Sequence, residues 1–337
     1  MSDSHSPSTR PSEPGHSHEE SGKPCAHHHE DSHGHHGSHL GGHHHSHLPA
    51  SASSGTLSTT LIFSIALNLL FVGAEAFAGW ISNSVALLAD AGHNFGDVLG
   101  LALSLFAVRL SLRPPTERHT WGLKRSTILA SLVNALALIA LVVIIFHEAA
   151  QRLLAPSPVD TGVVAITALI GIVVNSLTAW LLHRHDQSDV NVRGAFLHML
   201  ADAAVSAGVV ASALLIAWTG WVWVDAAVSF LIAGVILAGT WGILIESLRL
   251  NLDAVPRGIE LKEIIQALEG LPGVGQVYDL HVWRTSTTTS ALSAHLVRGN
   301  LSDNDEFLGS ATKLLKERFG ISHATLQVET SRLSEGC

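Results

Sequence analysis

The chain is poor in charged residues. Only 14% of its 337 residues are Asp, Glu, Lys or Arg, whereas 47% are hydrophobic, and this balance is not typical of a soluble protein. Three stretches contain no charged residue at all: 126–146, 161–182 and 226–245. The alternative, buried core helices of a large enzyme, does not readily supply several apolar runs of this length. The scarcity of charge therefore favours a membrane protein over a soluble helical bundle.

Cysteine is nearly absent, and the net charge is negative. Cys25 and Cys337 are the two cysteines of the chain, and both lie in terminal regions that we place in the cytosol, where structural disulfides are rare. The formal net charge of −9 argues against a nucleic-acid partner. A disulfide-stabilised secreted domain and a nucleic-acid-binding protein are therefore both disfavoured.

What the chain has instead is long apolar segments. A helix needs about 20 apolar residues to cross a hydrocarbon core of roughly 30 Å. Six segments of about that length are present: 57–80, 85–108, 126–146, 160–182, 195–217 and 225–247. We therefore predict an all-α six-helix transmembrane domain over residues 56–249, in contact with membrane lipid.

The positive residues are concentrated in two of the loops between these segments. The loops that follow the second and the fourth segment contain Arg109, Arg113, Arg118, Lys124, Arg125, Arg184 and Arg193. The loops on the other side contain Arg152 alone. Because cytoplasmic loops are enriched in Lys and Arg, this pattern places both termini in the cytosol. The polar first 50 residues give no sign of a cleavable signal peptide.

The two terminal regions differ from the apolar middle. Residues 1–55 are of low complexity and hold 14 of the 23 histidines; we interpret them as a disordered cytosolic tail that gathers metal loosely, in preference to a purification tag. Residues 250–330 read in the order α-β-β-α-β, which predicts a small sheet with its helices on one face. Ser302 and Asp305 have the spacing of a capping box and predict the start of the second helix.

Two pairs of ionisable residues interrupt the apolar segments. His93 and Asp97 lie four residues apart in the second segment, and His198 and Asp202 repeat this spacing in the fifth. Each ionisable group at the bilayer centre costs about 2.5–3.5 kcal/mol, and the i, i+4 spacing places both members of a pair on one helix face. Two imidazoles and two carboxylates from two helices would form the four-ligand shell of a tetrahedral Zn²⁺ site.

A simpler interpretation is that such residues only hydrogen-bond neighbouring helices. The duplication of the H-x-x-x-D pair favours the metal site. Asp90 shares the face of Asp97 but lies nearer the outer end of its segment, so we interpret it as lining the exit path or bonding nearby Asn and Ser groups. Asn68 and Glu75 in the first segment are similarly interpreted as pathway or packing residues.

Small residues also recur in the second segment. Gly92, Gly96 and Gly100 form a ridge that permits close approach of another helix. We expect this ridge to help bring the two H-x-x-x-D faces together, although plain helix packing would use the same pattern.

Together these features resemble those of the cation diffusion facilitator family. The residues that carry the resemblance are "NSVALLADAGHNFGD", "NVRGAFLHMLAD", "YDLHVW" and "HATLQVE". The resemblance implies a homodimeric Zn²⁺/H⁺ antiporter that exports zinc, with Cd²⁺, Co²⁺ or Ni²⁺ as further cargo. The transport site would be His93, Asp97, His198 and Asp202. The short loop between the fourth and fifth segments lacks the His-rich insert of many eukaryotic relatives, which favours the bacterial cytoplasmic (inner) membrane.

The same resemblance implies a metallochaperone-like cytosolic domain that dimerises and often binds further metal, here structural Zn²⁺. Its candidate ligands are His295 and Glu329, followed by His281 and His323. Tyr278 stands where some members carry a histidine, so the family pattern is incomplete. We expect no metal site in the loop after the second segment, where His119 is the one histidine, and no prosthetic group.

Two other functions are compatible with parts of the sequence. A membrane metallohydrolase would be an enzyme with an open metal position, but "HEAAQ" at His147 has Gln151 where a second histidine would be needed. A membrane-anchored metal sensor or buffer would use the tail and the C-terminal domain and would not need ionisable pairs in two segments. We therefore expect a transporter and not an enzyme.

Overall fold

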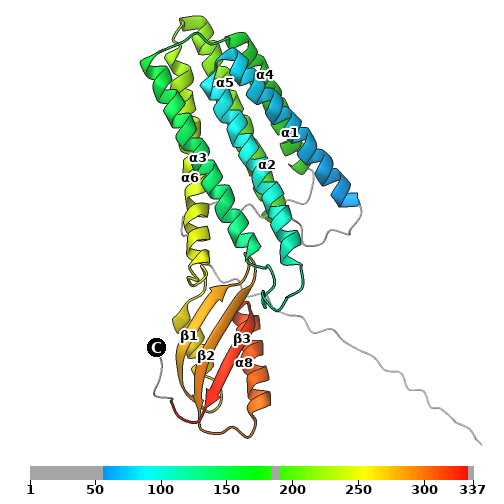
Figure 1. The fold of residues 1–337 in the computed structure, drawn as a ribbon, viewed down its shortest axis with the longest axis vertical. Helices are drawn as coiled ribbons and strands as arrows, with labels where there is room; N and C mark the ends of the chain where they lie inside the picture. Colours follow the sequence, from blue (N-terminus) through cyan, green and yellow to red (C-terminus); the bar gives the residue numbers. More distant parts are fainter. Residues whose placement is uncertain (1–55, 184–189, 333–337) are drawn as a thin grey trace, which may run out of the picture. The chain divides into compact units, whose positions relative to one another are not determined.

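The computed structural model describes residues 56–183 and 190–332, with the side chains of residues 56–68, 181–192 and 195 left undescribed. The predicted tail, residues 1–55, and both cysteines lie outside the described residues. The described chain forms six long helices followed by a small α/β domain (Figure 1).

The six long helices are α1 to α6. Their bounds are Thr56–Ser82, Val85–Ser111, Ser126–Leu154, Thr161–His183, Val190–Thr219 and Trp223–Asn251. Helices α2 to α6 each contain a segment long and apolar enough to cross a membrane, and the described part of α1 adds the apolar stretch Leu69–Ser82. Helix α3 continues eight residues beyond the end of its predicted segment, and α5 begins five residues before the start of its predicted segment. These helices form a multi-pass membrane domain.

The outer surface of this domain is apolar. Exposed large side chains occur on all six helices, and examples are Leu70, Phe106, Ile144, Val173, Leu214 and Leu231. A soluble monomer does not expose apolar surface on this scale. Trp80, Trp218, Trp221 and Trp223 lie at the end of the helices where α1 and α5 finish, and tryptophan is enriched where a membrane meets water. The surface is therefore suited to lipid.

The glycine ridge of α2 packs on α3, not on α5. A Cβ added at Gly92 or Gly96 would meet the side chain of Leu141 or Leu138, and one at Gly100 would meet Asn134. The expectation that this ridge joins the two H-x-x-x-D faces was wrong. Each glycine is one residue, and thus about 100°, away from His93, Asp97 or the next position on that face, so the ridge and the ionisable face point to different neighbours.

Two sets of hydrogen bonds connect the helices at the end where α2 begins. Asp225 of α6 accepts hydrogen bonds from the Ser84 hydroxyl at 2.6 Å and the Val85 amide at 2.7 Å. It thereby supplies negative charge and an acceptor to the N-terminus of α2. Arg152 of α3 donates to the carbonyl of Asn83 at 2.9 Å, and Asn83 donates to the carbonyl of Pro158 at 3.1 Å. The α1–α2 and α3–α4 connections are therefore held together.

The C-terminal domain has the predicted order α-β-β-α-β. Its elements are α7 (Leu261–Glu269), β1 (Val274–Arg284), β2 (Ser290–Arg298), α8 (Asn304–Phe319) and β3 (Ile321–Glu329). The sheet order is β1-β2-β3, with β1 antiparallel and β3 parallel to β2. One core cluster joins buried residues of both helices and the sheet, among them Leu268, Leu292 and Leu315. A parallel β2–β3 pair requires a crossover, which α8 provides.

The start of α8 differs from the capping-box prediction. The N-cap residue is Asp303, not Ser302, and its side chain makes no cap hydrogen bond. Its carboxylate instead accepts two hydrogen bonds of 2.8 Å from Arg298 at the end of β2, and the Arg298 guanidinium holds the pKa of Asp303 below its ordinary value. The helix ends at Gly320, whose φ of 66° gives the left-handed C-cap that favours glycine.

Candidate metal centre

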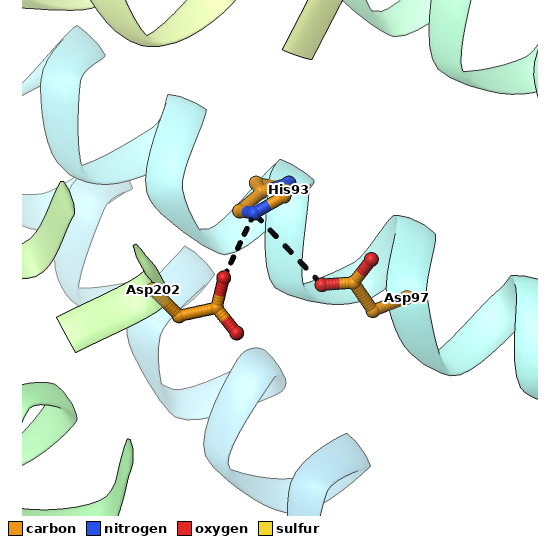
Figure 2. A group of neighbouring side chains, drawn as sticks. All are labelled: His93, Asp97 and Asp202. Carbon is orange, nitrogen blue, oxygen red and sulfur yellow. Dashed lines mark hydrogen bonds and ion pairs between the residues drawn. The ribbon is translucent and has the colours of Figure 1, made fainter. Parts of the chain in front are cut away.

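The four ionisable residues of α2 and α5 lie together in the structure. His93 Nε2 is 3.2 Å from Asp202 Oδ1 and 3.9 Å from Asp97 Oδ2. His198 Nε2 is 3.1 Å from Asp97 Oδ2 and 3.6 Å from Asp202 Oδ2. The shorter contact of each histidine crosses to the other helix. Figure 2 shows His93 between the carboxylates of Asp97 and Asp202. We call these four residues the transmembrane cluster.

The spacing within the transmembrane cluster suits a tetrahedral ion. Nitrogen and oxygen ligands at about 2.0–2.2 Å from Zn²⁺ lie about 3.3–3.6 Å from one another, because the edge of a tetrahedron is about 1.63 times its centre-to-corner distance. The four measured separations run from 3.1 to 3.9 Å. His93, Asp97 and Asp202 also offer ligand atoms that all lie within 4.8 Å of one another. His198 is not part of this three-residue group, so its ring must move closer to the other ligand atoms for all four residues to bind one ion.

The chemistry of these side chains couples metal to protons. Each short His–Asp contact is a hydrogen bond only while the histidine Nε2 carries a proton, and a metal ion uses that same nitrogen in its deprotonated form. Two carboxylates also balance the two charges of a divalent cation. Binding of a divalent cation therefore displaces protons from the histidine nitrogens, and the cluster becomes more positive when fewer than two protons leave it.

Exposure within the transmembrane cluster is uneven. The side chain of Asp97 is 30% exposed, those of His93 and His198 are 18% exposed, and that of Asp202 is 3% exposed. Asp97 lies toward the end of α2 that finishes at Ser111, whereas Asp90, about two turns nearer the start of α2, is fully buried. The cluster is thus more open toward the Ser111 end than toward the end held by Asp225.

The pathway candidates lie beside the cluster but do not join it. Asp90 accepts a hydrogen bond from Ser206 at 2.9 Å, and Glu75 accepts one from Asn94 at 2.9 Å. The side chain of Asn68 lies outside the described residues. Ser206 was not among the residues predicted from the sequence, although its position four residues after Asp202 places it on the ligand-bearing face of α5.

Two of the C-terminal candidates, His295 and Glu329, lie together with Tyr278, and we call these three residues the C-terminal cluster. His295 Nδ1 is 2.8 Å from Glu329 Oε1, and the Tyr278 hydroxyl donates to Glu329 Oε2 at 2.5 Å. Gln327 also donates to Glu329 Oε1 at 2.7 Å. The three members come from β1, β2 and β3 because Tyr278 pairs with His295 and His295 with Gln327 across the sheet. Both oxygens of Glu329 are already occupied by these donors.

The other two C-terminal candidates lie away from Glu329. His281 is exposed and 2.9 Å from Asp279, which has a left-handed φ of 49° at an irregularity of the β1–β2 register. His323 is exposed and lies six residues before Glu329 on β3, a separation of about 20 Å along a strand. The other oxygen of Asp279 is 3.7 Å from His295 Nε2, so His281 is linked to His295 through Asp279, whereas His323 lies apart from these residues.

The possible metallohydrolase motif is located on α3. His147 Nε2 lies 2.8 Å from Gln151 Nε2, at an exposed position. These two side chains pair with each other through one helical turn.

The family models match both domains of the chain. A model described as the cation efflux transmembrane domain matches residues 61–250, and one described as the cation efflux protein cytoplasmic domain matches residues 256–331. The chain therefore belongs to the cation efflux family of membrane proteins, which confirms the family that the sequence motifs indicate.

Individual relatives cover most of the chain. Zinc transporter ZitB of Escherichia coli (strain K12) is 36% identical over 271 residues, which are 80% of this chain and 86% of the relative. The cadmium, cobalt and zinc/H(+)-K(+) antiporter of Bacillus subtilis (strain 168) is 32% identical over 82% of this chain and 91% of the relative. Both relatives are named as transporters and neither as an enzyme.

A solved structure, the metal-bound C-terminal domain of the CzcD transporter from Cuprividus metallidurans, is 29% identical and covers 21% of this chain and 99% of that chain, with a TM-score of 0.20.

Proposed function

We propose that this protein is a secondary transporter that exports Zn²⁺ from the cytosol in exchange for protons. The transmembrane cluster carries this proposal: two imidazoles and two carboxylates meet at separations of 3.1 to 3.9 Å between two membrane helices. This donor set suits Zn²⁺, since imidazole favours Zn²⁺ over Mn²⁺ and Mg²⁺. The four protein ligands leave no vacant position for a catalytic water, which argues against a hydrolase.

The names of the relatives support both the cargo and the counter-ion. One relative is named a zinc transporter, and another an antiporter of cadmium, cobalt and zinc for H⁺ and K⁺. For this chain we infer Zn²⁺ as the main cargo, Cd²⁺, Co²⁺ and Ni²⁺ as further cargo, and H⁺ as the ion that returns. The ion is a substrate of the transporter and not a resident cofactor.

Direction is inferred from the charges at the two ends of the helices. The basic residues Arg109, Arg113 and Lys124 lie where α2 ends and α3 begins, and Trp218 and Trp221 lie at the opposite end. The positive-inside rule places the first end in the cytosol, and Asp97, the most exposed member of the transmembrane cluster, lies toward it. Zinc would therefore enter from the cytosol and leave through an alternate, outward-open conformation. For the location of the protein we propose the bacterial cytoplasmic membrane.

The C-terminal domain is inferred to join two copies of the chain. The family model that matches residues 256–331 is that of the cytoplasmic domain of these efflux proteins, and its short name refers to a dimer. A homodimer in detergent solution, measured by light scattering, and a monomer after removal of residues 256–337 are the expected results.

Reconstituted transport tests the main proposal. Asp202→Ala removes the most buried carboxylate of the transmembrane cluster, which contacts both histidines. Zinc uptake by proteoliposomes with an imposed proton gradient should fall to the level of empty liposomes. His147→Ala is the matched control, because His147 lies on a membrane helix and is exposed and remote in sequence from the cluster, and it should transport normally. Full transport by the Asp202→Ala protein would refute the shared site.

A further inference from the structure

Two buried carboxyl groups beside the transmembrane cluster have no place in the function described so far. Glu75 on α1 and Asp90 on α2 are both 0% exposed. A buried carboxylate is costly unless each oxygen receives a hydrogen bond or a counter-charge. The negative charge of these two groups must therefore be reduced by a proton or offset by their surroundings.

Each carboxyl group receives one hydrogen bond from a neutral donor. Asn94 donates to Glu75 Oε2, and Ser206 donates to Asp90 Oδ2, both at 2.9 Å. The other two oxygens, Glu75 Oε1 and Asp90 Oδ1, are buried and receive no hydrogen bond from any donor within residues 56–183 and 190–332. The donors thus satisfy one oxygen of each carboxyl group and leave the other oxygen without a hydrogen bond.

The two carboxyl groups are neighbours, because Asn94, which donates to Glu75, lies one turn after Asp90 on the same face of α2. A hydrogen bond between two carboxyl groups requires that one of them carries a proton, because an ionised carboxylate can only accept. The oxygens left without donors can therefore be satisfied by a single proton shared between the two groups. Like charges on neighbouring groups in a poorly solvated site also disfavour ionisation of both groups.

Among the side chains that the structure describes, no Lys or Arg is a main electrostatic partner of the pair. The charged groups that act on it most strongly are His93 of α2 and Asp202 of α5. Helix α4 packs against both α1 and α5, and it has no ionisable residue between 161 and 182. The charge of the pair is therefore sensitive to whatever occupies the transmembrane cluster.

The pair lies on the side of the transmembrane cluster that faces away from the proposed cytosolic end of the helices. Asp90 precedes His93 by three residues on α2, which is about 4.5 Å along the axis. Ser206, its hydrogen-bond partner, follows Asp202 by four residues on the antiparallel α5, about 6 Å along the axis. Both displacements lead away from the Ser111 end of α2, so the pair lies next to the cluster on its more buried side.

We propose that Glu75 and Asp90 form a second proton-binding site, which holds one shared proton while the transmembrane cluster is metal-free and releases it when a divalent cation binds there. On release the O–H bond of the protonated carboxyl group breaks, its electron pair stays on the oxygen, and the proton passes to water. The pair then carries two negative charges beside the bound dication. This inference rests on the proposed zinc–proton exchange and adds a proton that is not displaced from a metal ligand.

The experiment measures protons and carboxyl groups separately, on the full-length protein in detergent. Infrared difference spectroscopy distinguishes the C=O stretch of a protonated carboxyl group from that of a carboxylate. The zinc-free protein should show the protonated band, and Zn²⁺ should remove it. Glu75→Gln and Asp90→Asn should each lose the band, and zinc titration in weak buffer should release about one fewer proton per bound zinc than the unmodified protein.

Asp225→Asn is the matched control, because Asp225 is a buried carboxyl group whose two oxygens already accept hydrogen bonds from Ser84 and Val85; the protonated band should persist in it. A protonated band absent from the unmodified zinc-free protein, or unchanged by zinc that calorimetry shows to be bound, would overturn the proposal. So would a Glu75→Gln protein that releases as many protons per zinc as the original.

Failure of the proposed function would give a different result. Zinc binding that is absent from the unmodified protein, or unaffected by Asp97→Ala, would refute the transport site itself. In that case the band of the zinc-free protein would still report whether the pair holds a proton. Because this measurement uses the unmodified chain, the pair remains testable even where a substituted protein does not fold.

Discussion

The transmembrane cluster and the C-terminal cluster are built from the same kinds of side chain but are held in different ways. In the transmembrane cluster each histidine Nε2 lies between two carboxylates, and the contacts come from facing helices. In the C-terminal cluster the one buried carboxylate, that of Glu329, already receives hydrogen bonds from Tyr278 and Gln327 as well as contacting His295. Histidine and carboxylate content alone therefore does not identify a metal site; the other partners of each ligand atom matter as much.

The largest expected effect contrasts one histidine from each cluster. His93→Ala should abolish zinc transport and weaken zinc binding by at least about a hundredfold, since loss of a direct ligand costs more than loss of its supporting contacts. His295→Ala should change transport by no more than about twofold, since His295 lies in the C-terminal domain and is not a member of the transmembrane cluster. Transport by proteoliposomes and calorimetric zinc titration measure both. Equal losses in the two proteins would remove the distinction between the clusters.

A second prediction concerns the support of the C-terminal cluster. Leu292 on β2 is fully buried in the core of the C-terminal domain, and Leu292→Ala should destabilise that domain by about 3 kcal/mol because it leaves a cavity. Leu301→Ala, at a 41% exposed position, is the control and should change stability by less than about 0.5 kcal/mol. Denaturant unfolding followed by tryptophan fluorescence of Trp283 would report the difference. Similar midpoints for the two variants would contradict the assignment of this core.

A third prediction sharpens the chemistry of the transmembrane cluster. His198→Asp replaces a nitrogen ligand by oxygen and adds a negative charge, so competition uptake should shift from Zn²⁺ toward Mn²⁺ and Cd²⁺ while some transport remains. The matched substitution His281→Asp, at an exposed histidine of the C-terminal domain, should leave the selectivity unchanged. An unchanged order of competing metals in His198→Asp would argue that this side chain is not a ligand.

The smallest expected effect concerns pH and the C-terminal domain. Arg298 lowers the pKa of Asp303, so the stabilisation from this pair is complete above the ordinary aspartate pKa, near 3.9, and is lost as the pH falls through the lower pKa of the folded domain. Asp303→Asn should therefore unfold at a slightly lower temperature than the original protein at neutral pH, and the difference should narrow under strongly acidic conditions. Melting curves collected over a series of pH values test this, and a gap that stays constant would contradict it.

Local features of the sequence predicted much of the architecture. The lengths of the apolar segments and the i, i+4 spacing of the two H-x-x-x-D pairs are interpreted through helix geometry alone. Both can therefore be recognised in the sequence without knowledge of the fold. The order α-β-β-α-β of the C-terminal domain was also readable, and the structure confirms it. The metal-ligand roles of His93, Asp97, His198 and Asp202 remain predictions that their geometry makes testable.

Contacts between distant segments were not readable in the same way. The glycine ridge of α2 contacts α3 and not α5. A ridge of small residues predicts close packing but does not identify the partner helix. The N-cap of α8 is Asp303 and not Ser302, and the Asp303 side chain pairs with Arg298 at the end of β2 instead of capping the helix. In both cases the sequence pattern did not identify the partner of the residue.

The sequence by itself determined that this protein crosses a membrane several times and that it carries paired histidines and aspartates on two helix faces, because segment length and residue spacing are local properties. Only the tertiary structure decided that each histidine lies nearest the aspartate of the other helix, that Tyr278 reaches Glu329 across the sheet, and that Asn94 holds Glu75 beside the face of α2 that carries Asp90. The physical reason is that packing between elements determines which side chains come close enough to hydrogen-bond or to neutralise a buried charge. Helix periodicity does not specify these partners.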